Sequence, residues 1–200
     1  MTKKKYKLCR RLGTGLFEKC QTQKFAARET TGKSKKMAPR RSDFGNQLIE
    51  KQKVRFMYGV RERQFRNYVD KAMEHGKKGT TPASLLFQSL EERLDNAVYR
   101  LGFAHTRALA RQMASHGHFL VNGKKLTIPS YWLKMGDVIS IREGSKNSGL
   151  FKEIDAKLKA VKKPDWLTFD EKAKTAKVSG APKNPDAFLN FQAVIEFYTR

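Results

Sequence analysis

The stretch that decides the fold is HTRALARQMASHGHFLVNGKKL, residues 105–126 of the chain. Thr106 can cap a short helix whose apolar residues recur at three- and four-residue steps, and Gly117 ends that helix. Three apolar residues then lead into Asn122 and Gly123, a pair that supplies the positive φ angles of a two-residue hairpin turn. The sequence therefore predicts a helix that runs into a two-stranded antiparallel hairpin.

The residues that follow extend this unit. They predict a third strand, a helix and two further short strands, in residues 138–143, 145–163, 166–170 and 175–180. The resulting unit is two antiparallel helices packed on a small sheet. The last segment, NFQAVIEFYTR, fits helical spacing better than alternation, and its apolar face needs a partner, most simply the helices of residues 42–90.

Upstream, apolar residues at helical spacing predict a helical domain. The three predicted helices are residues 42–59, 61–76 and 81–102. Ser42 and Asp43 can cap the first helix, Pro82 suits the first turn of the third, and Gly102 ends it. A domain junction is expected within the third helix, near residues 90–92.

The charge balance is the outlying feature of the composition. The 200 residues hold 42 Lys and Arg against 19 Asp and Glu, which gives a formal net charge of +23. So large an excess opposes compact packing by self-repulsion unless a polyanion neutralises it. Nucleic acid is therefore the first partner we expect, and an anionic membrane surface is the alternative.

The sequence also indicates a compartment. The start, MTKKKYKLCRRLG, carries charge without the apolar core of a signal peptide. No run approaches the roughly 18 apolar residues of a membrane span. Two cysteines in a chain of this size do not make a disulfide framework, so a reducing, cytosolic setting is expected.

A metal site is not expected. Cys9 and Cys20 have ten residues between them, whereas zinc sites use close pairs of cysteines. His116 ends a predicted helix, where its partial charge suits the helix dipole, and His118 begins a strand. Four converging ligands are not visible, and the sequence predicts no cofactor of another kind.

A catalytic constellation is not visible either, because no nucleophile motif, phosphate-binding loop or dinucleotide fingerprint occurs. Asp95 lies beside an arginine within a helical stripe, where a catalytic acid is conceivable. An ion pair with Arg93 or Arg100 is the commoner arrangement, and we predict that the chain is not an enzyme.

Basic residues are the candidate nucleic-acid contacts. Arginine makes forked contacts to phosphates, amides reach sugars and base edges, and tyrosine stacks on bases. The stretch from Glu50 to Tyr68 supplies Lys51, Lys53, Arg55, Tyr58, Arg61, Arg63, Gln64, Arg66 and Asn67. The helix and hairpin of residues 105–126 add Arg107, Arg111, Lys124 and Lys125, predicted to form one basic ridge that follows a phosphate backbone.

Residues 1–44 are dense in charge and poor in aliphatic side chains. They predict a basic arm, loosely folded until it meets its partner, and a merely solubilising tail is the alternative. The cations assigned to RNA contact in this arm are Lys3, Lys4, Lys5, Lys7, Arg10 and Arg11.

A family resemblance is carried by three blocks. RLDNAVYRLGFAHTRALARQMASHGHFLVNGKKL resembles the S4 RNA-binding module, which also occurs in some pseudouridine synthases, in a tyrosyl-tRNA synthetase tail and in a small heat-shock RNA binder. SDFGNQLIEKQKVRFMYGVRERQFRNY and the terminal NFQAVIEFYTR resemble the S4 family of small-subunit ribosomal proteins, of bacterial or organellar type. The resemblance covers residues 42–200.

The resemblance implies a structural constituent of the small subunit. Such a protein binds the five-prime domain of 16S rRNA, nucleates assembly, lies beside ribosomal proteins S5 and S3, and lines the channel by which mRNA enters. It contributes to translational accuracy, and it is ribosome-bound in the cytoplasm or an organelle. By position, Lys35, Lys36 and Arg40 fall at the mRNA channel. The S5 border receives Asp43, Gln47, Glu196 and Tyr198.

The residue patterns and the family resemblance both predict an α+β fold. A helical rRNA-binding domain (42–90 and 184–200) is interrupted by the S4-like domain (91–183), and the basic arm (1–41) precedes them. Many relatives hold zinc with cysteines in the arm, but here Tyr6 stands where the first would be. Cys9 matches the second and Cys20 lies outside the pattern, so the arm is expected to fold without metal.

Two other functions stay open from the sequence. One is a free RNA-binding regulator, such as a repressor of its own message or a binder of stalled large subunits. The other is an RNA-modifying enzyme, for whose catalytic domain the chain has no room.

Overall fold

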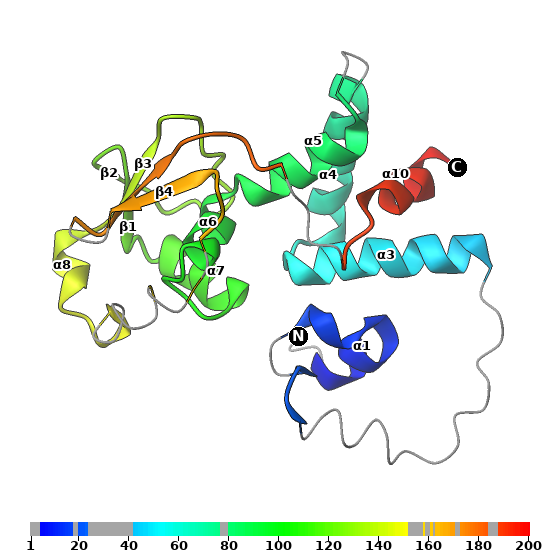
Figure 1. Ribbon diagram of the computed structural model, residues 1–200, viewed down its shortest axis with the longest axis horizontal. Helices are drawn as coiled ribbons and strands as arrows, with labels where there is room; N and C mark the ends of the chain where they lie inside the picture. The colour runs from blue at the N-terminus through cyan, green and yellow to red at the C-terminus, as the bar shows by residue number, and fades with distance from the viewer. Residues whose placement is uncertain are drawn as a thin grey trace. The chain divides into compact units, whose positions relative to one another are not determined.

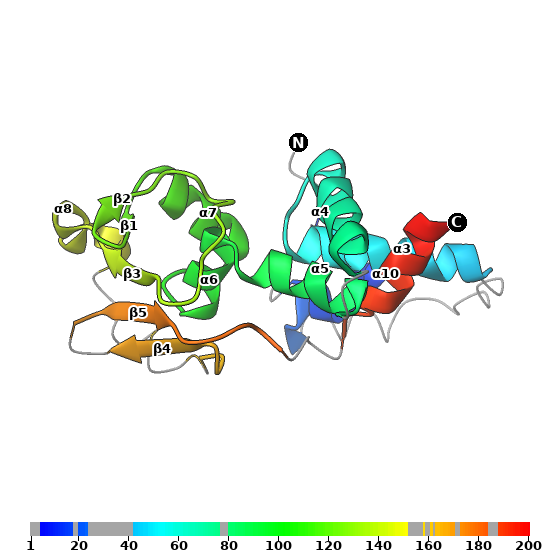
Figure 2. The ribbon, with the colours of Figure 1, turned by 90° about the horizontal axis from the view of Figure 1, so that it is seen from above.

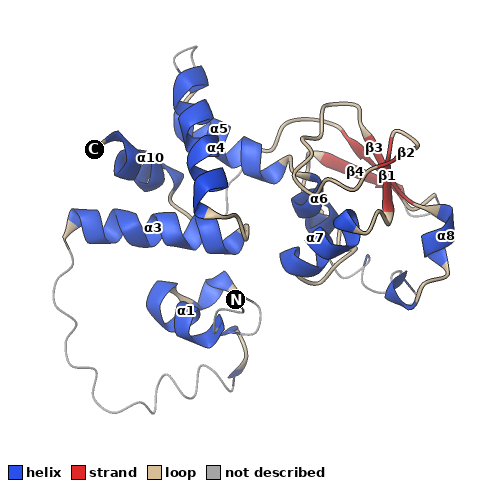
Figure 3. Cartoon of the chain, turned by 180° about the vertical axis from the view of Figure 1, so that it is seen from behind, coloured by secondary structure: helices blue, strands red, loops and turns tan. Residues whose placement is uncertain are grey.

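The computed structural model describes residues 5–17, 20–23, 42–76, 80–151, 158, 161, 163–170, 173–183 and 188–200 (Figure 1). The chain divides into two compact units. The first comprises Met1–Ala83 and Asp186–Arg200, and the second is Ser84–Pro185. The first unit is discontinuous in sequence, since the second is inserted into it. All described strands belong to the second unit (Figure 3).

Three helices form the main body of the first unit. They are α3 (Asp43–Met57), α4 (Glu62–His75) and α10 (Phe191–Thr199), and all three were predicted. The Ser42 side chain accepts a hydrogen bond from the amide of Gly45, as expected of a helix cap. The helix α10 packs along α3, with the rings of Phe44 and Phe197 stacked 5.3 Å apart. The terminal segment is thus a helix, and its apolar face is covered by α3.

The N-terminal lobe packs on α3. It contains α1 (Lys5–Leu12) and the 3-10 helix η1 (Thr14–Leu16). The side chains of Cys9, Leu12, Leu16 and Cys20 are buried together, with Ile49, Phe56 and Met57 of α3 against them. These apolar side chains supply a small core for this part of the arm, while a loose fold in the absence of RNA stays a prediction. The remainder of the arm lies outside the described residues.

A disulfide joins Cys9 and Cys20. This bond was not predicted from the sequence. The two cysteines are eleven residues apart, a spacing that suits neither a metal-binding pair nor a framework of several disulfides. The helix α1 ends at Leu12, however, and the chain reverses through η1, so that Cys20 returns to Cys9. The two sulfurs form part of the lobe's core.

Phe188, from the C-terminal segment, also packs on this lobe. The ring of Phe188 lies so close to Gly13 and Gly15 that an added Cβ would approach it to 3.0 Å and 3.2 Å. Gly13 also has a φ of 111°, which disfavours other residues. The ammonium of Lys53 lies 4.8 Å from the centre of the same ring. Segments from both ends of the chain therefore meet on α3.

The second unit is a five-stranded antiparallel sheet with helices on it. The sheet order is β2-β1-β3-β5-β4, with β1 Phe119–Val121, β2 Lys124–Lys125, β3 Val138–Ile141, β4 Leu167–Asp170 and β5 Thr175–Val178. Figure 2 shows β5 and β4 beyond β3. The helices α6 (Leu94–Arg100) and α7 (Arg107–Ser115) share one apolar core with the sheet. The α+β fold is confirmed, as are the hairpin and its Asn122-Gly123 turn, with φ angles of 51° and 76°.

The predicted helix of residues 81–102 is wrong in one respect, because it is two helices. Its parts are α5 (Pro82–Glu91) and α6, and Arg93 between them is extended, with a ψ of 139°. Arg93 forms an isolated β-bridge with Trp132. The amide of Leu94 donates to the carbonyl of Tyr131 at 2.9 Å. Pairing with this loop compensates the helical hydrogen bonds lost at the break.

The predicted continuous helix of residues 145–163 is wrong in its first part, where the helix is interrupted. A short helix, α8 (Glu143–Lys146), and a 3-10 helix, η4 (Gly149–Phe151), replace its beginning. Most of its remaining residues lie outside the described ranges. Among the described residues, no helix combines the length and the hydropathy that crossing a bilayer requires.

The disulfide generates a first prediction. Replacing Cys9 and Cys20 with serine removes a cross-link whose loop length corresponds to roughly 3 kcal/mol in the chain-entropy estimate. We expect amides in residues 5–23 to exchange hydrogen faster, while those of the second unit keep their protection. Hydrogen exchange followed by mass spectrometry measures both. The oxidised protein treated with a reductant is the matched control and should behave like the variant; equal protection of the lobe in oxidised and reduced protein would contradict the prediction.

Candidate nucleic-acid interface

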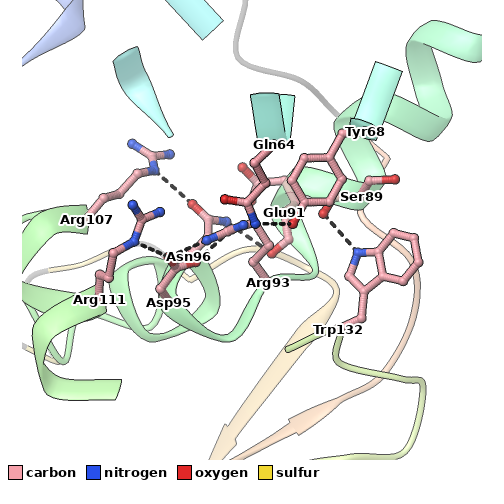
Figure 4. A network of polar contacts seen from close by, with 10 residues as sticks. All are labelled: Gln64, Tyr68, Ser89, Glu91, Arg93, Asp95, Asn96, Arg107, Arg111 and Trp132. Carbon is pink, nitrogen blue, oxygen red and sulfur yellow. Dashed lines mark hydrogen bonds and ion pairs between the residues drawn. The ribbon is translucent and has the colours of Figure 1, made fainter. Parts of the chain in front are cut away.

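Two arginines on α7 are anchored by two consecutive residues of α6 (Figure 4). The Nε of Arg111 donates to Oδ2 of Asp95 at 2.8 Å, and the Nε of Arg107 donates to Oδ1 of Asn96 at 2.8 Å. The hydroxyl of Thr106 accepts from an amide in the first turn of α7, which fixes the start of that helix. The predicted pair Arg107 and Arg111 is therefore brought to one place, side by side.

Asp95 belongs to a buried ion pair. The Nε and Nη2 of Arg93 donate to its two oxygens at 3.0 Å and 2.7 Å, and the residues are 2% and 4% exposed. A forked contact of this kind is the strongest form of a guanidinium–carboxylate pair. The interpretation of Asp95 as an ion-pair partner of Arg93 is confirmed. Arg100 instead binds Glu91, through two hydrogen bonds of 2.9 Å.

The electrostatic result is a cluster that keeps a positive charge. The single carboxylate of Asp95 faces two guanidinium groups, Arg93 and Arg111. Asn96 is neutral, so it orients Arg107 without cancelling its charge. The guanidinium of Arg107 also lies 4.4 Å from the ring centre of Tyr99, in a cation–π contact. Such a cluster can receive an anionic ligand.

The hairpin places two more predicted cations in solvent. Lys124 and Lys125 are both exposed on β2, at one edge of the sheet. The Asn122 side chain fixes their turn, because it donates to Asp137 at 2.8 Å and accepts from the amide of Val138 at 2.9 Å. That these lysines form one continuous ridge with Arg107 and Arg111 stays a prediction.

In the first unit, three predicted site residues converge on Glu62. Its carboxylate accepts from Lys51 Nζ at 2.7 Å and from the Tyr198 hydroxyl at 3.0 Å, and it pairs with Arg55 Nε at 3.1 Å. Lys51 is buried, with its ammonium 4.5 Å from the ring centre of Phe197. Burial, with the charge and hydrogen bond of Glu62, raises the pKa of Tyr198. The ammonium of Lys51 therefore serves internal packing.

The other predicted contacts differ in exposure. The exposed cations and amide are Lys5, Lys7, Arg10, Arg11, Arg61, Arg63, Arg66 and Asn67. Lys53, Arg55 and Gln64 are half-buried. Tyr58 is 3% exposed, so its ring is not on the surface for base stacking in this structure. Lys3, Lys4, Lys35, Lys36 and Arg40 lie outside the described residues.

The residues assigned to a protein border meet at α3 and α10. Gln47 Nε2 donates to Oε2 of Glu196 at 3.2 Å, and Gln47 is itself buried. Asp43 is exposed at the start of α3. Close by, Phe44 is 49% exposed and stacks on Phe197. This surface combines aromatic and polar groups.

The two histidines of residues 116–118 lie close to each other and to Ser145. His116 and His118 have ring centres 6.1 Å apart, and Nδ1 of His118 lies 3.0 Å from the Ser145 hydroxyl. Burial, followed by the charges of His116 and Arg142, lowers the pKa of His118. Among the described residues, no three candidate ligands gather in one place.

The residues that support the cations were not predicted from the sequence. Asn96 and Tyr99 lie within one turn of α6, and Glu62 begins α4. A signal was present for Asn96, because it directly follows the aspartate that was considered for an ion pair. No local pattern marks Glu62, since its three partners come from α3 and α10.

Two family models match adjoining parts of the chain. One, described as the ribosomal protein S4/S9 N-terminal domain, matches residues 1–91, and the other, described as the S4 domain, matches residues 92–139. The chain belongs to the ribosomal protein S4 family. This family is structural and non-enzymatic, so the prediction of an RNA-binding protein without enzymatic activity is confirmed.

Relatives named small ribosomal subunit protein uS4 align over much of the S4 chain. The protein from Roseiflexus sp. (strain RS-1) is 45% identical, covering 97% of this chain and 96% of the relative. That from Syntrophomonas wolfei is 40% identical, covering 96% and 95%. That from Persephonella marina is 47% identical, covering 79% and 77%. The resemblance inferred from the sequence is confirmed.

The Glu62 cluster generates a pH prediction. Burial is the largest single influence on the pKa of Glu62 and raises it, but Lys51, Tyr198 and Arg55 together lower it below its usual value of 4.5. A lowered carboxyl pKa stabilises the fold above the unfolded pKa, and this stabilisation is lost as the pH falls through the folded pKa. Glu62→Gln should therefore lower the free energy of unfolding at pH 7 and have less effect at pH 3.5.

The expected loss is below about 1 kcal/mol, because the side chain of Glu62 is 49% exposed and solvent screens the pairs. Urea unfolding at both pH values measures it. Glu74→Gln, at an exposed position of the same helix, is the matched control and should change little. An equal loss from Glu62→Gln at pH 7 and pH 3.5 would mean that the charge of Glu62 is not the stabilising feature.

Proposed function

We propose that this chain is a structural protein of the small ribosomal subunit that binds 16S rRNA, without catalytic activity of its own. The observation that carries the proposal is the anchored arginine pair. Arg107 and Arg111 are held side by side on α7, within the part of the chain that matches an RNA-binding domain family. Forked guanidinium groups in a fixed arrangement suit the phosphates of a folded RNA.

Exposed cations of the helical unit support the same partner. Arg61, Arg63 and Arg66 lie at the beginning of α4, all exposed. The exposed cations of α1, Lys5, Lys7, Arg10 and Arg11, add to them. The formal net charge of +23 makes a polyanionic partner the natural means of neutralisation. Each unit thus presents exposed cations of its own, and basic residues spread over a long stretch of sequence suit an RNA that is recognised by its tertiary fold.

Our finer proposal is that the RNA target is the five-prime domain, and that binding there nucleates assembly of the subunit. The chain would be ribosome-bound in the cytoplasm, or in an organelle. The half-exposed Phe44, stacked on Phe197, and the exposed carboxylate of Glu196 are groups typical of a protein contact, which supports ribosomal protein S5 as the neighbour of this surface. Contacts with S3 and with mRNA at Lys35, Lys36 and Arg40, and an effect on translational accuracy, rest on the family resemblance alone.

A sucrose gradient of cell lysate, probed for this chain, tests the assignment to the subunit. The chain should sediment with small subunits and with translating ribosomes. A free RNA-binding regulator would instead remain largely in light fractions. Chelation of magnesium, which separates the subunits, should leave the chain with the small one. Sedimentation with large subunits only would contradict the proposal.

Salt dependence tests the assignment of the arginine pair. Replacing Arg107 and Arg111 with glutamine should weaken binding to five-prime domain RNA. It should also reduce the slope of log Kobs against log salt concentration by roughly 0.7–0.9 for each phosphate contact removed. Filter binding between about 50 and 200 mM salt measures both quantities. Lys146→Gln, which removes one exposed cation paired with Glu143 on α8, is the control and should retain the wild-type slope. An unchanged slope in the double variant would exclude these arginines from phosphate contact.

A further inference from the structure

We propose that Asp95 and Asn96 are positioning residues, which fix the guanidinium groups of Arg111 and Arg107 in their binding orientation before RNA arrives. This inference rests on the proposed function, because it assigns a mechanism to the same arginine pair. Neither Asp95 nor Asn96 is on the surface, since they are 4% and 2% exposed. They can therefore act on RNA only through the residues that they hold.

The geometry matches two adjacent acceptors to one turn of a neighbouring helix. Asp95 and Asn96 are consecutive in the first turn of α6. Arg107 and Arg111 are four residues apart on α7 and so lie on one face of that helix. Each acceptor takes the Nε of one arginine, at 2.8 Å in both cases. A hydrogen bond at Nε restricts the last torsions of the side chain and orients the plane of the guanidinium group.

Each acceptor is itself held in place. Nδ2 of Asn96 donates to the carbonyl of Glu91 at 3.1 Å, which turns its Oδ1 toward Arg107. Asp95 is fixed by its forked contact with buried Arg93. The ring of Tyr99, one turn along α6, supports the guanidinium of Arg107 from a second direction. The positions of both arginines are thus determined by a buried, hydrogen-bonded base.

The chemical types of the two acceptors differ in a way that suits an anionic ligand. An aspartate in place of Asn96 would still accept from Arg107, but it would lose the hydrogen bond to the Glu91 carbonyl and would cancel the charge of Arg107. The amide orients the guanidinium group and leaves the charge intact. The carboxylate of Asp95 is divided between Arg93 and Arg111. The network therefore positions two cations while supplying one negative charge for three arginines.

The energetic advantage is conformational. An arginine side chain that becomes immobile on binding loses rotamer freedom, and this loss weakens association. If the side chain is already oriented in the free protein, most of this rotamer freedom is lost when the protein folds and not when RNA binds. Releasing one arginine should weaken RNA binding roughly two- to tenfold. The number of phosphates contacted in the complex should not change, so the salt slope should stay the same.

Substitutions at Asn96 separate positioning from charge. Asn96→Ala should weaken binding to five-prime domain RNA two- to tenfold, with a parallel line in the plot of log Kobs against log salt concentration. Asn96→Asp keeps an acceptor for Arg107 but adds a charge, so its slope should fall by roughly the 0.7–0.9 of one contact. Loss of slope in Asn96→Ala, or unchanged affinity, would overturn the positioning role.

A double-mutant cycle with Arg107→Gln tests whether Asn96 acts through that arginine. In the Arg107→Gln background, Asn96→Ala should cause little further loss. An equal loss in both backgrounds would show a general structural role and overturn the inference. Thermal unfolding of each variant reports on its fold. If Asn96→Ala does not fold, Tyr99→Leu, which removes the ring beneath Arg107 and stays apolar, takes its place in the same cycle with the same expected outcome.

The experiments distinguish a failure of the proposed RNA contact from a failure of the positioning role. If wild-type protein binds the RNA but Arg107→Gln changes neither affinity nor slope, the proposed contact itself is wrong. If Arg107→Gln weakens binding and Asn96→Ala does not, the contact stands and the positioning role falls.

Discussion

The buried ion pair of Arg93 with Asp95 is the interaction on which the arginine cluster of the second unit depends. Removing two charged groups from water is costly, and the forked hydrogen bonds at 3.0 Å and 2.7 Å offset that cost only while both partners remain. Losing one partner of such a pair costs about 3–5 kcal/mol, because it leaves an uncompensated charge in the interior. The extended backbone at Arg93 separates α5 from α6, and it directs the guanidinium group at a carboxylate two residues away. The helix break and the arginine anchor therefore have a common origin.

The helical unit solves a different electrostatic problem. It carries many cations but must also attach α10, a segment far away in sequence. Glu62 does this by binding Lys51 and Arg55 of α3 together with Tyr198 of α10. Two cations of a strongly basic stretch thereby contribute to packing within this unit. Arg61, Arg63 and Arg66 at the beginning of α4 are instead exposed, and Arg66 pairs with Asp70 of the same helix at 3.9 Å. A run of basic residues thus divides into internal and external members according to which helix face each one occupies.

Local signals predicted most elements, and non-local ones account for the errors. Asn122-Gly123 determines its turn through its own φ angles, and Ser42 and Thr106 cap their helices through hydrogen bonds within three residues, so a single stretch of sequence contains the whole cause. The break at Arg93 depends instead on pairing with a loop near Tyr131 and Trp132. No glycine or proline marks the position of the break in the sequence. The inward orientation of Lys51 depends on α4 and α10, and the burial of Tyr58 could not be inferred from its basic neighbours. The pairing of Cys9 with Cys20 follows from a chain reversal that a count of cysteines cannot reveal. For the candidate site, residue types at the right spacing identified Arg107 and Arg111, but not the acceptors that hold them.

In the second unit, the arginines at α6 and α7 and the lysines of the β1–β2 hairpin have separate uses. Arginines 93, 100, 107 and 111 each donate to a protein oxygen, and each of those oxygens lies on α5 or α6. A guanidinium group has five donors, so it can bind a protein acceptor at Nε and remain a cation with further donors. An ammonium group offers no comparable division between an anchored edge and an outward one. Lys124 and Lys125, at the sheet edge, are exposed point charges, suited to attraction at longer range. An approaching polyphosphate would then meet two kinds of cation one after the other. The solvated lysines of the hairpin would attract it at longer range through their electrostatic field, and the arginines fixed by α6 would bind it through their geometry.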